Sequence, residues 1–283
     1  MKIKKRIINI FLYMILVAVL IAVALPLVYT VASSFKTNAE ILVNPERIFS
    51  AHPTFDNYRA AWTSPDFNVG RLLWNSTWYT ILNVLITVSA SCMCGYVFAR
   101  GRFPLKKVIF TCFTALMFIK TGGIGIYATF QLLNLVHLRQ SLWALLTVHL
   151  FGIPIVNIYL VKGYISSLPS ALDEAAKIDG CGFFRTFLHI ILPLLKPIVA
   201  TVSILAFQNS WNDYIMPTIF TITRPEQRTF MVGLMALKNS SGAATSWNLM
   251  LAGAVITMLP VTIAYAFGNR YFVKGLAEGA VKG

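Results

Sequence analysis

The chain has 283 residues, of which 57% are hydrophobic and only 12% are charged, and its mean hydropathy is +0.69. A soluble globular domain carries about a quarter charged residues, so this composition excludes the soluble class and indicates a protein of the lipid bilayer. The net charge of +14 does not indicate nucleic-acid binding, because the basic residues lie at the ends of apolar runs and not on one polar face.

A helix needs roughly 20 largely apolar residues to cross a bilayer, and six runs of the sequence reach that length. They cover residues 7–32, 74–99, 108–127, 142–164, 197–220 and 247–267. The first run contains Ala22-x-Ala24, a pattern of signal-peptide cleavage sites, but it continues beyond the length of a signal-peptide core, which favours a retained helix. We therefore expect an all-α, polytopic membrane protein with six transmembrane helices.

The distribution of Lys and Arg sets the expected orientation in the membrane. If the N-terminus is cytoplasmic, fifteen of the 24 basic residues fall on the cytoplasmic side and eight on the other side, while Lys120 lies inside the third run. This bias predicts that both termini are cytoplasmic. It also places residues 165–196, between the fourth and fifth runs, in the cytoplasm; we call them the connecting segment.

The connecting segment has the pattern of two short helices joined by a turn. Ser170-x-x-Asp173 predicts a capping box at the start of the first helix, and Gly180 permits the left-handed backbone that ends it. Residues 183–192 then form a broad apolar face, and Pro193 interrupts the path into the fifth run. We expect a compact helix–turn–helix on the cytoplasmic side.

Two interpretations of this segment are open. An amphipathic connector lying on the lipid headgroups would explain its phenylalanines. The acidic Asp173, Glu174 and Asp179, however, sit poorly on a membrane surface that is itself anionic. Contact with a protein partner is the sharper interpretation.

Several motifs carry a family resemblance. Glu174-Ala175-Ala176, three residues, Gly180, nine residues and Ile190-x-Leu192-Pro193 resemble the EAA loop of permease subunits of ATP-binding-cassette (ABC) importers, with no departure in spacing. The stretch 209–214 and the tail 269–283, which ends in Lys-Gly, are similar to the maltose-permease-like subfamily for carbohydrate uptake. The resemblance covers most of the chain after about residue 74.

The resemblance implies that the EAA loop forms a coupling helix, which docks in a groove of a cytoplasmic ATPase subunit and transmits its closure to the membrane helices. By position, Glu174, Ala175, Ala176 and Gly180 are the docking residues that it implies. We add Asp173 and Asp179 as acidic residues on the contact surface.

The resemblance also implies the partners and the location. These are a second homologous permease subunit, a cytoplasmic ATPase dimer that holds ATP-Mg, and an extracytoplasmic solute-binding protein, in the bacterial cytoplasmic (inner) membrane and in contact with its lipid. No cofactor is expected on this chain, and no nucleic acid. The expected domains are residues 1–73, a transmembrane helix with an extracytoplasmic loop, and residues 74–283, the importer transmembrane domain.

The sequence contains no recognisable catalytic motif. It has no G-x-x-x-x-G-K-[ST] phosphate loop and no H-E-x-x-H motif, so ATP hydrolysis is expected on another polypeptide. A polytopic membrane enzyme would have to use His149 with Asp213, or with Ser240 and Ser241, and a lone His in an apolar helix is more often structural. A secondary transporter is a second alternative, although six spans without visible inverted halves would be small for one.

Polar residues within a span usually face a cavity or a neighbouring helix. The fifth run has five residues of that kind or beside them, and they are the expected substrate pathway: Gln208, Asn209, Trp211, Asn212 and Asp213. A tryptophan beside amides suits sugar recognition. The other reading is that Trp211 belongs to the aromatic interface belt and that the polar residues bridge helices.

Two further regions are singled out. Residues 120–123 interrupt the third run, either as a helix break that lines the pathway or because Lys120 reaches the outer interface and 124–135 forms a separate segment. The loop around 239–246 precedes the last run, and the resemblance implies that it meets the bound solute. An ordinary flexible loop is the alternative.

Overall fold

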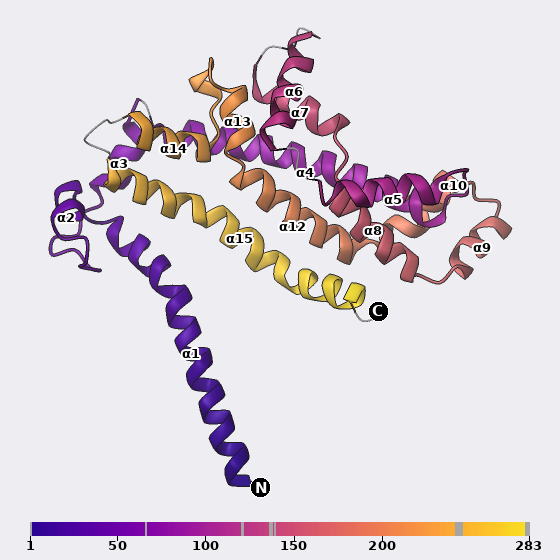
Figure 1. The fold of residues 1–283 in the computed structure, drawn as a ribbon, viewed down its shortest axis with the longest axis horizontal. Coiled ribbons are helices and arrows are strands. Elements are labelled where there is room, and N and C mark those ends of the chain that lie inside the picture. The colour runs from indigo at the N-terminus through magenta and orange to yellow at the C-terminus, as the bar shows by residue number, and fades with distance from the viewer. Residues whose placement is uncertain are drawn as a thin grey trace. The chain divides into compact units, whose positions relative to one another are not determined.

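A computed structural model describes residues 2–65, 67–119, 122–135, 138, 140–240 and 246–280. All regular secondary structure in these residues is helical, as the sequence predicts (Figure 1). The chain forms two compact units. One comprises Met1–Leu72 and Gly233–Leu259, and the other comprises Leu73–Val232 and Pro260–Gly283.

The helices follow one another along the chain with short connections. Their bounds are α1 Lys2–Ser33, α2 Asn38–Val43, α3 Asp56–Thr63, α4 Val69–Arg100, α5 Lys106–Leu116, α6 Gly122–Leu135, α7 Leu142–Phe151, α8 Ile155–Ser167, α9 Ala171–Ile178, α10 Phe183–Thr186, the π-helix η1 Phe187–Ile191, α11 Leu192–Leu194, α12 Lys196–Asn212, α13 Ile215–Phe220, the 3₁₀-helix η2 Pro225–Gln227, α14 Phe230–Ser240 and α15 Trp247–Ala280.

Three helices in the described residues are long and apolar enough to cross a membrane: Ile8–Ser33, Val69–Arg100 and Trp247–Gly268. Two bent pairs bring the number to five if each pair counts as one span. These are α7 with α8, bent by 43°, and Phe183–Leu194 with α12, bent by 80°. Prolines explain both bends, because Pro154 lies between α7 and α8 and Pro197 lies in the first turn of α12.

The structure differs from the expected six spans at the third run. Residues 108–127 do not form one continuous helix, because α5 ends at Leu116 and α6 begins at Gly122. Each of these helices is shorter than a bilayer crossing requires. The separate α6 agrees with the expectation of a distinct segment there, whereas Lys120 itself lies outside the described residues.

The first unit is held by close helix contacts and one buried amide. A Cβ on Gly233 would lie 2.5 Å from Leu72, and a Cβ on Gly253 would lie 2.8 Å from Phe67, so both glycines permit close packing. The side chain of Asn57 donates to the carbonyls of Ser34 at 2.7 Å and Lys36 at 2.8 Å. The residues after α1 are therefore held by hydrogen bonds to their backbone carbonyls, in addition to the apolar packing within this unit.

The second unit has a core beside the connecting segment. Its buried members come from α4, α8, η1, the turn before α12 and α12 itself, and are Cys92, Tyr96, Val161, Ile165, Phe187, Ile191, Leu195, Ile198 and Val202. Gly95 lets α4 approach α8, because a Cβ there would lie 2.7 Å from a methyl group of Val161. This core supports the connecting segment, which leaves α8 and returns into α12.

Candidate functional site

The first helix of the connecting segment, α9, ends in a glycine-dependent turn. Gly180 has a φ of +73°, the left-handed region that favours glycine. The N–H of Cys181 donates to the carbonyl of Ala176 at 2.8 Å, and the N–H of Gly180 donates to that of Lys177 at 3.0 Å. This is the Schellman pattern of helix termination, so the helix end predicted at Gly180 is confirmed.

The start of α9 differs from the expected capping box. Ser170 has helical backbone angles, φ −66° and ψ −23°, and its side chain makes no capping hydrogen bond. Asp173 does not serve the helix end either, because its carboxylate pairs with Arg100. The tertiary ion pair has replaced the local cap that the sequence pattern indicates.

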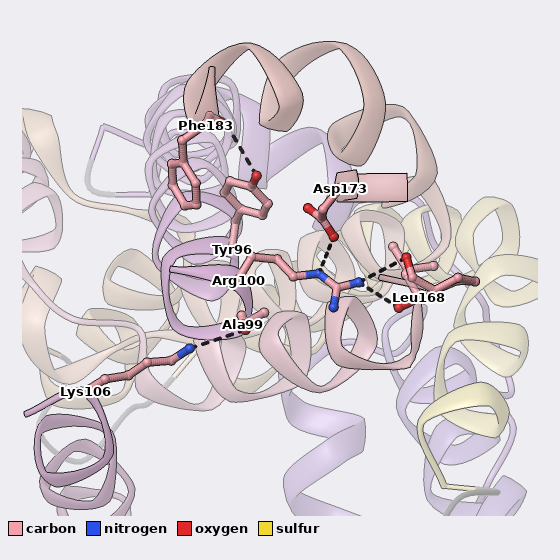
Figure 2. Close-up of polar contacts among 8 residues, drawn as sticks. Tyr96, Ala99, Arg100, Lys106, Leu168, Asp173 and Phe183 are labelled. Atoms are coloured by element: carbon pink, nitrogen blue, oxygen red, sulfur yellow. Dashed lines mark hydrogen bonds and ion pairs between the residues drawn. The ribbon is translucent and has the colours of Figure 1, made fainter. Parts of the chain in front are cut away.

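Arg100, the last residue of α4, joins three parts of the chain around the connecting segment (Figure 2). Its Nε lies 2.9 Å from a carboxylate oxygen of Asp173, and each side chain is only 17% exposed. Its Nη2 donates to the carbonyl of Leu168 at 2.6 Å and to that of Pro169 at 3.5 Å. One guanidinium thus ties the end of α4 to the residues between α8 and α9 and to the first turn of α9.

Tyr96 holds the other half of the segment, beyond Gly180. Its hydroxyl donates to the carbonyl of Phe183 at 3.3 Å, and its ring centroid lies 4.5 Å from that of Phe183 and 5.1 Å from that of Phe187. Figure 2 shows Tyr96 and Arg100 reaching α10 and α9 from the same helix. Phe187 is therefore part of the protein's own core, while Phe184 remains exposed.

The predicted coupling residues divide between two faces of α9. Ala176 is buried and Asp173 points toward Arg100. The remaining ones, Glu174, Ala175, Asp179 and Gly180, are exposed, as is the neighbouring Ile178. The exposed set forms a small surface of mixed polar and apolar character, with two acids, an alanine, a glycine and an isoleucine.

Basic side chains surround the inner side of this segment. Lys106 donates to the carbonyls of Ala99 at 3.3 Å and Gly101 at 2.8 Å, which satisfies acceptors at the end of α4. Burial, together with the nearby Lys162, lowers the pKa of Lys106. A cavity of 480 Å³ lies between the end of α4 and α9, and its charged lining residues include the basic Arg102, Lys106 and Lys177 and the acidic Asp173 and Glu174.

The expected substrate-pathway residues do not share one environment. Trp211 is buried, with its ring stacked on Phe207 at 5.6 Å between centroids, so in this conformation the ring packs within the protein. Gln208, Asn209 and Asn212 are exposed, and Asp213 is half-buried where α12 ends. Gln208 also lines a cavity of 380 Å³ with residues of α12 and of the 261–266 stretch of α15.

Other singled-out residues have structural partners or lie outside the description. The Nε2 of His149 is 3.0 Å from the hydroxyl of Tyr79, the satisfied pairing expected of a structural histidine. Residues 241–245, the centre of the expected solute-facing loop, lie outside the described residues, as do the side chains of the tail 269–283.

Sequence reasoning missed Arg100 and Tyr96. Arg100 enters it only as one of many cytoplasmic basic residues, and Tyr96 only as part of a span. A usable signal was present, because the two residues are four apart and therefore share one face of a helix at its cytoplasmic end. An acid-bearing loop that follows such a face is a natural partner for the arginine.

The chain is similar to known transport proteins over its whole length. It is 32% identical to the galactooligosaccharides transport system permease protein GanQ of Bacillus subtilis, with 100% of this chain and 99% of that protein covered. It is 30% identical to the maltodextrin transport system permease protein MalD of Streptococcus pneumoniae, with 100% and 98% covered.

A solved structure agrees at the level of the fold. The crystal structure of a bacterial ABC transporter involved in the import of the acidic polysaccharide alginate matches with a TM-score of 0.80 at 21% identity, and covers 95% of this chain and 98% of that chain. Residues 88–278 match the family described as binding-protein-dependent transport system inner membrane component. The chain therefore belongs to that family, the multi-pass inner-membrane permease subunits of ABC importers, whose ATPase activity lies on a separate subunit.

Proposed function

We propose that this permease subunit takes up an oligosaccharide or a related sugar and that α9 is its docking helix for the ATPase. The observation that carries the docking role is the division of α9 into a held inner face, with Asp173 and Ala176, and an exposed outer face. Membership of this family excludes the two alternatives considered from the sequence, a secondary transporter and a membrane enzyme.

The outer face is suited to docking because little of it is needed for the chain's own fold. Glu174 and Asp179 offer charge to basic partner residues, and Ala175 lets a partner backbone approach closely. A Cβ on Gly180 would meet nothing within 4 Å, so the space around this turn is open to a partner. Asp173, in contrast, acts from within the fold.

The proposed assembly pairs this chain with a second homologous permease subunit and a cytoplasmic ATPase dimer, which binds ATP-Mg. An extracytoplasmic solute-binding protein delivers the solute. The excess of basic residues on one side supports two cytoplasmic termini. We also propose that the importer transmembrane domain comprises residues 74–283 and that residues 1–73 form a transmembrane helix and an outer loop.

The sugar assignment rests on the relatives, whose names give galactooligosaccharides and maltodextrin as what they transport. Within the chain, the cavity beside Gln208 supports a polar contact with the solute. Asn209, Asn212 and Asp213 complete the proposed pathway, and Trp211 takes part only in a conformation that opens its packing against Phe207.

The function is tested in a strain that lacks this subunit, with a panel of labelled maltodextrins and galactooligosaccharides. We expect uptake of at least one of them to be lost and to return with the wild-type chain but not with Gly180→Asp, which places a charged side chain on the docking surface. The variant should reach the membrane in normal amount. Normal uptake by that variant would contradict the docking role, and unchanged uptake of every sugar in the deletion strain would contradict the sugar assignment.

A further inference from the structure

The docking helix α9 is short and is connected by turns on both sides. Its contacts with the other helices therefore determine whether a movement of α9 is transmitted to them. A helix that hung on flexible linkers would absorb a push from a partner. The structure instead attaches it through a charged, largely covered contact, since Arg100 and Asp173 are 2.9 Å apart and each side chain is 17% exposed. Ala176, the buried residue of α9, lies on the next turn of the same inner face.

The attachment leads specifically to α4. Arg100 is the last residue of this 32-residue helix, and Tyr96 lies one turn before it. Arg100 contacts the first turn of α9, whereas Tyr96 contacts Phe183 and Phe187 on the far side of Gly180. One turn of α4 therefore contacts the connecting segment on both sides of the turn at Gly180.

Arginine is the residue type that this position requires. Its Nε faces the carboxylate of Asp173 in an ion pair, while its Nη2 donates to the carbonyl of Leu168 at 2.6 Å, so one planar group makes contacts in two directions. A lysine ammonium would keep the charge but could not reproduce both contacts in this fixed fork geometry.

We propose that Arg100 is a positioning residue that transmits movement of α9 to α4, through its ion pair with Asp173 and its hydrogen bond to Leu168. The proposal rests on the docking role given above for α9. Movement of α9 by the ATPase then displaces the cytoplasmic end of α4, a helix long enough to carry the displacement into the membrane. Loss of these two contacts leaves the ATPase docked on the outer face of α9 but uncouples ATP hydrolysis from solute transport.

The test uses the complete transporter, with Arg100→Ala, Arg100→Lys and Asp173→Asn, and Arg102→Ala as a matched control. Arg102 is an exposed arginine two residues away, so its removal changes the net charge equally. We measure recovery of the ATPase with the purified permease, ATP hydrolysis, and solute transported per ATP hydrolysed. A typical coupling energy predicts a fall of about tenfold in that ratio for Arg100→Ala, with a smaller fall for Arg100→Lys and Asp173→Asn.

Each outcome bears on the proposal. An unchanged ratio in Arg100→Ala, or an equal fall in Arg102→Ala, would overturn it, and so would a loss of transport that only follows loss of the ATPase from the complex. If Arg100→Ala does not accumulate, Asp173→Asn and Arg100→Lys decide by the same ratio. Gly180→Asp separates the two proposals. Normal uptake in that variant would refute the docking role of α9. Defective uptake in Gly180→Asp together with a normal transport-to-ATP ratio in Arg100→Ala would refute only the positioning role of Arg100.

Discussion

Tyr96 and Arg100 lie one turn apart on α4, and each contacts a different side of the turn at Gly180. The tyrosine contacts the apolar residues of α10 and η1, and the arginine contacts the acidic first turn of α9. Through these two contacts the connecting segment is held against the end of α4.

The turn at Gly180 should depend on backbone conformation and not on space. A Cβ there meets no atom within 4 Å, but the φ of +73° costs an L-residue roughly 1–2 kcal/mol. We expect Gly180→Ala to lower both the thermal stability of the segment and solute uptake. Gly182→Ala is the control, because Gly182 also has open space and its φ of −70° suits any residue. Equal effects of the two substitutions would show that the left-handed turn is not the cause.

The contact between α4 and α8 should be sensitive to volume. At Gly95, a Cβ would lie 2.7 Å from Val161, whereas at Gly163, on α8, it would meet nothing within 4 Å. Gly95→Ala should destabilise the detergent-solubilised protein by about 1–3 kcal/mol because the helices must separate. Gly163→Ala should leave the thermal inactivation temperature unchanged or raise it. A neutral Gly95→Ala would mean that the helices separate without cost.

The hydroxyl of Tyr96 should contribute less than its ring. Tyr96→Phe removes the hydrogen bond to Phe183, which predicts a loss of about 0.5–1.5 kcal/mol in the free energy of unfolding, while ring packing is kept. Tyr96→Ala also removes the contacts with Phe183 and Phe187 and should cost clearly more. Thermal inactivation of the two variants compares the contributions, and equal losses would assign the role to the hydroxyl alone.

A buried residue and an exposed residue of α12 should respond differently to substitution by alanine. Trp211→Ala leaves a large void beside Phe207 and should cost about 3–5 kcal/mol of stability, seen as poor recovery of folded protein. Gln208→Ala should leave stability unchanged but weaken the solute dependence of uptake, because Gln208 lines the cavity between α12 and α15. If Gln208→Ala transports with unaltered solute dependence, the proposed pathway does not include it.

Local features of the connecting segment were predictable because local chemistry decides them. Gly180 ends α9 since its backbone freedom is needed there, and Pro197 accompanies the sharp change of direction into α12. The capping pattern of Ser170 and Asp173 misled, because a partner 73 residues earlier in the chain, Arg100, takes the carboxylate. For Trp211 the sequence leaves two interpretations open, a sugar contact or a packing role, and only the packed helix shows that the ring is covered.

The most direct test of the account is site-specific photo-crosslinking from Ala175, an exposed residue of α9, in the assembled transporter. We expect a crosslink to the ATPase subunit whose yield changes when ATP is bound. The matched control is the exposed Leu42 in α2, which the proposed topology places outside the cytoplasm and which should give no ATPase crosslink. Absence of the ATPase crosslink from Ala175 in a transport-competent complex would contradict the assignment of α9 as the docking helix.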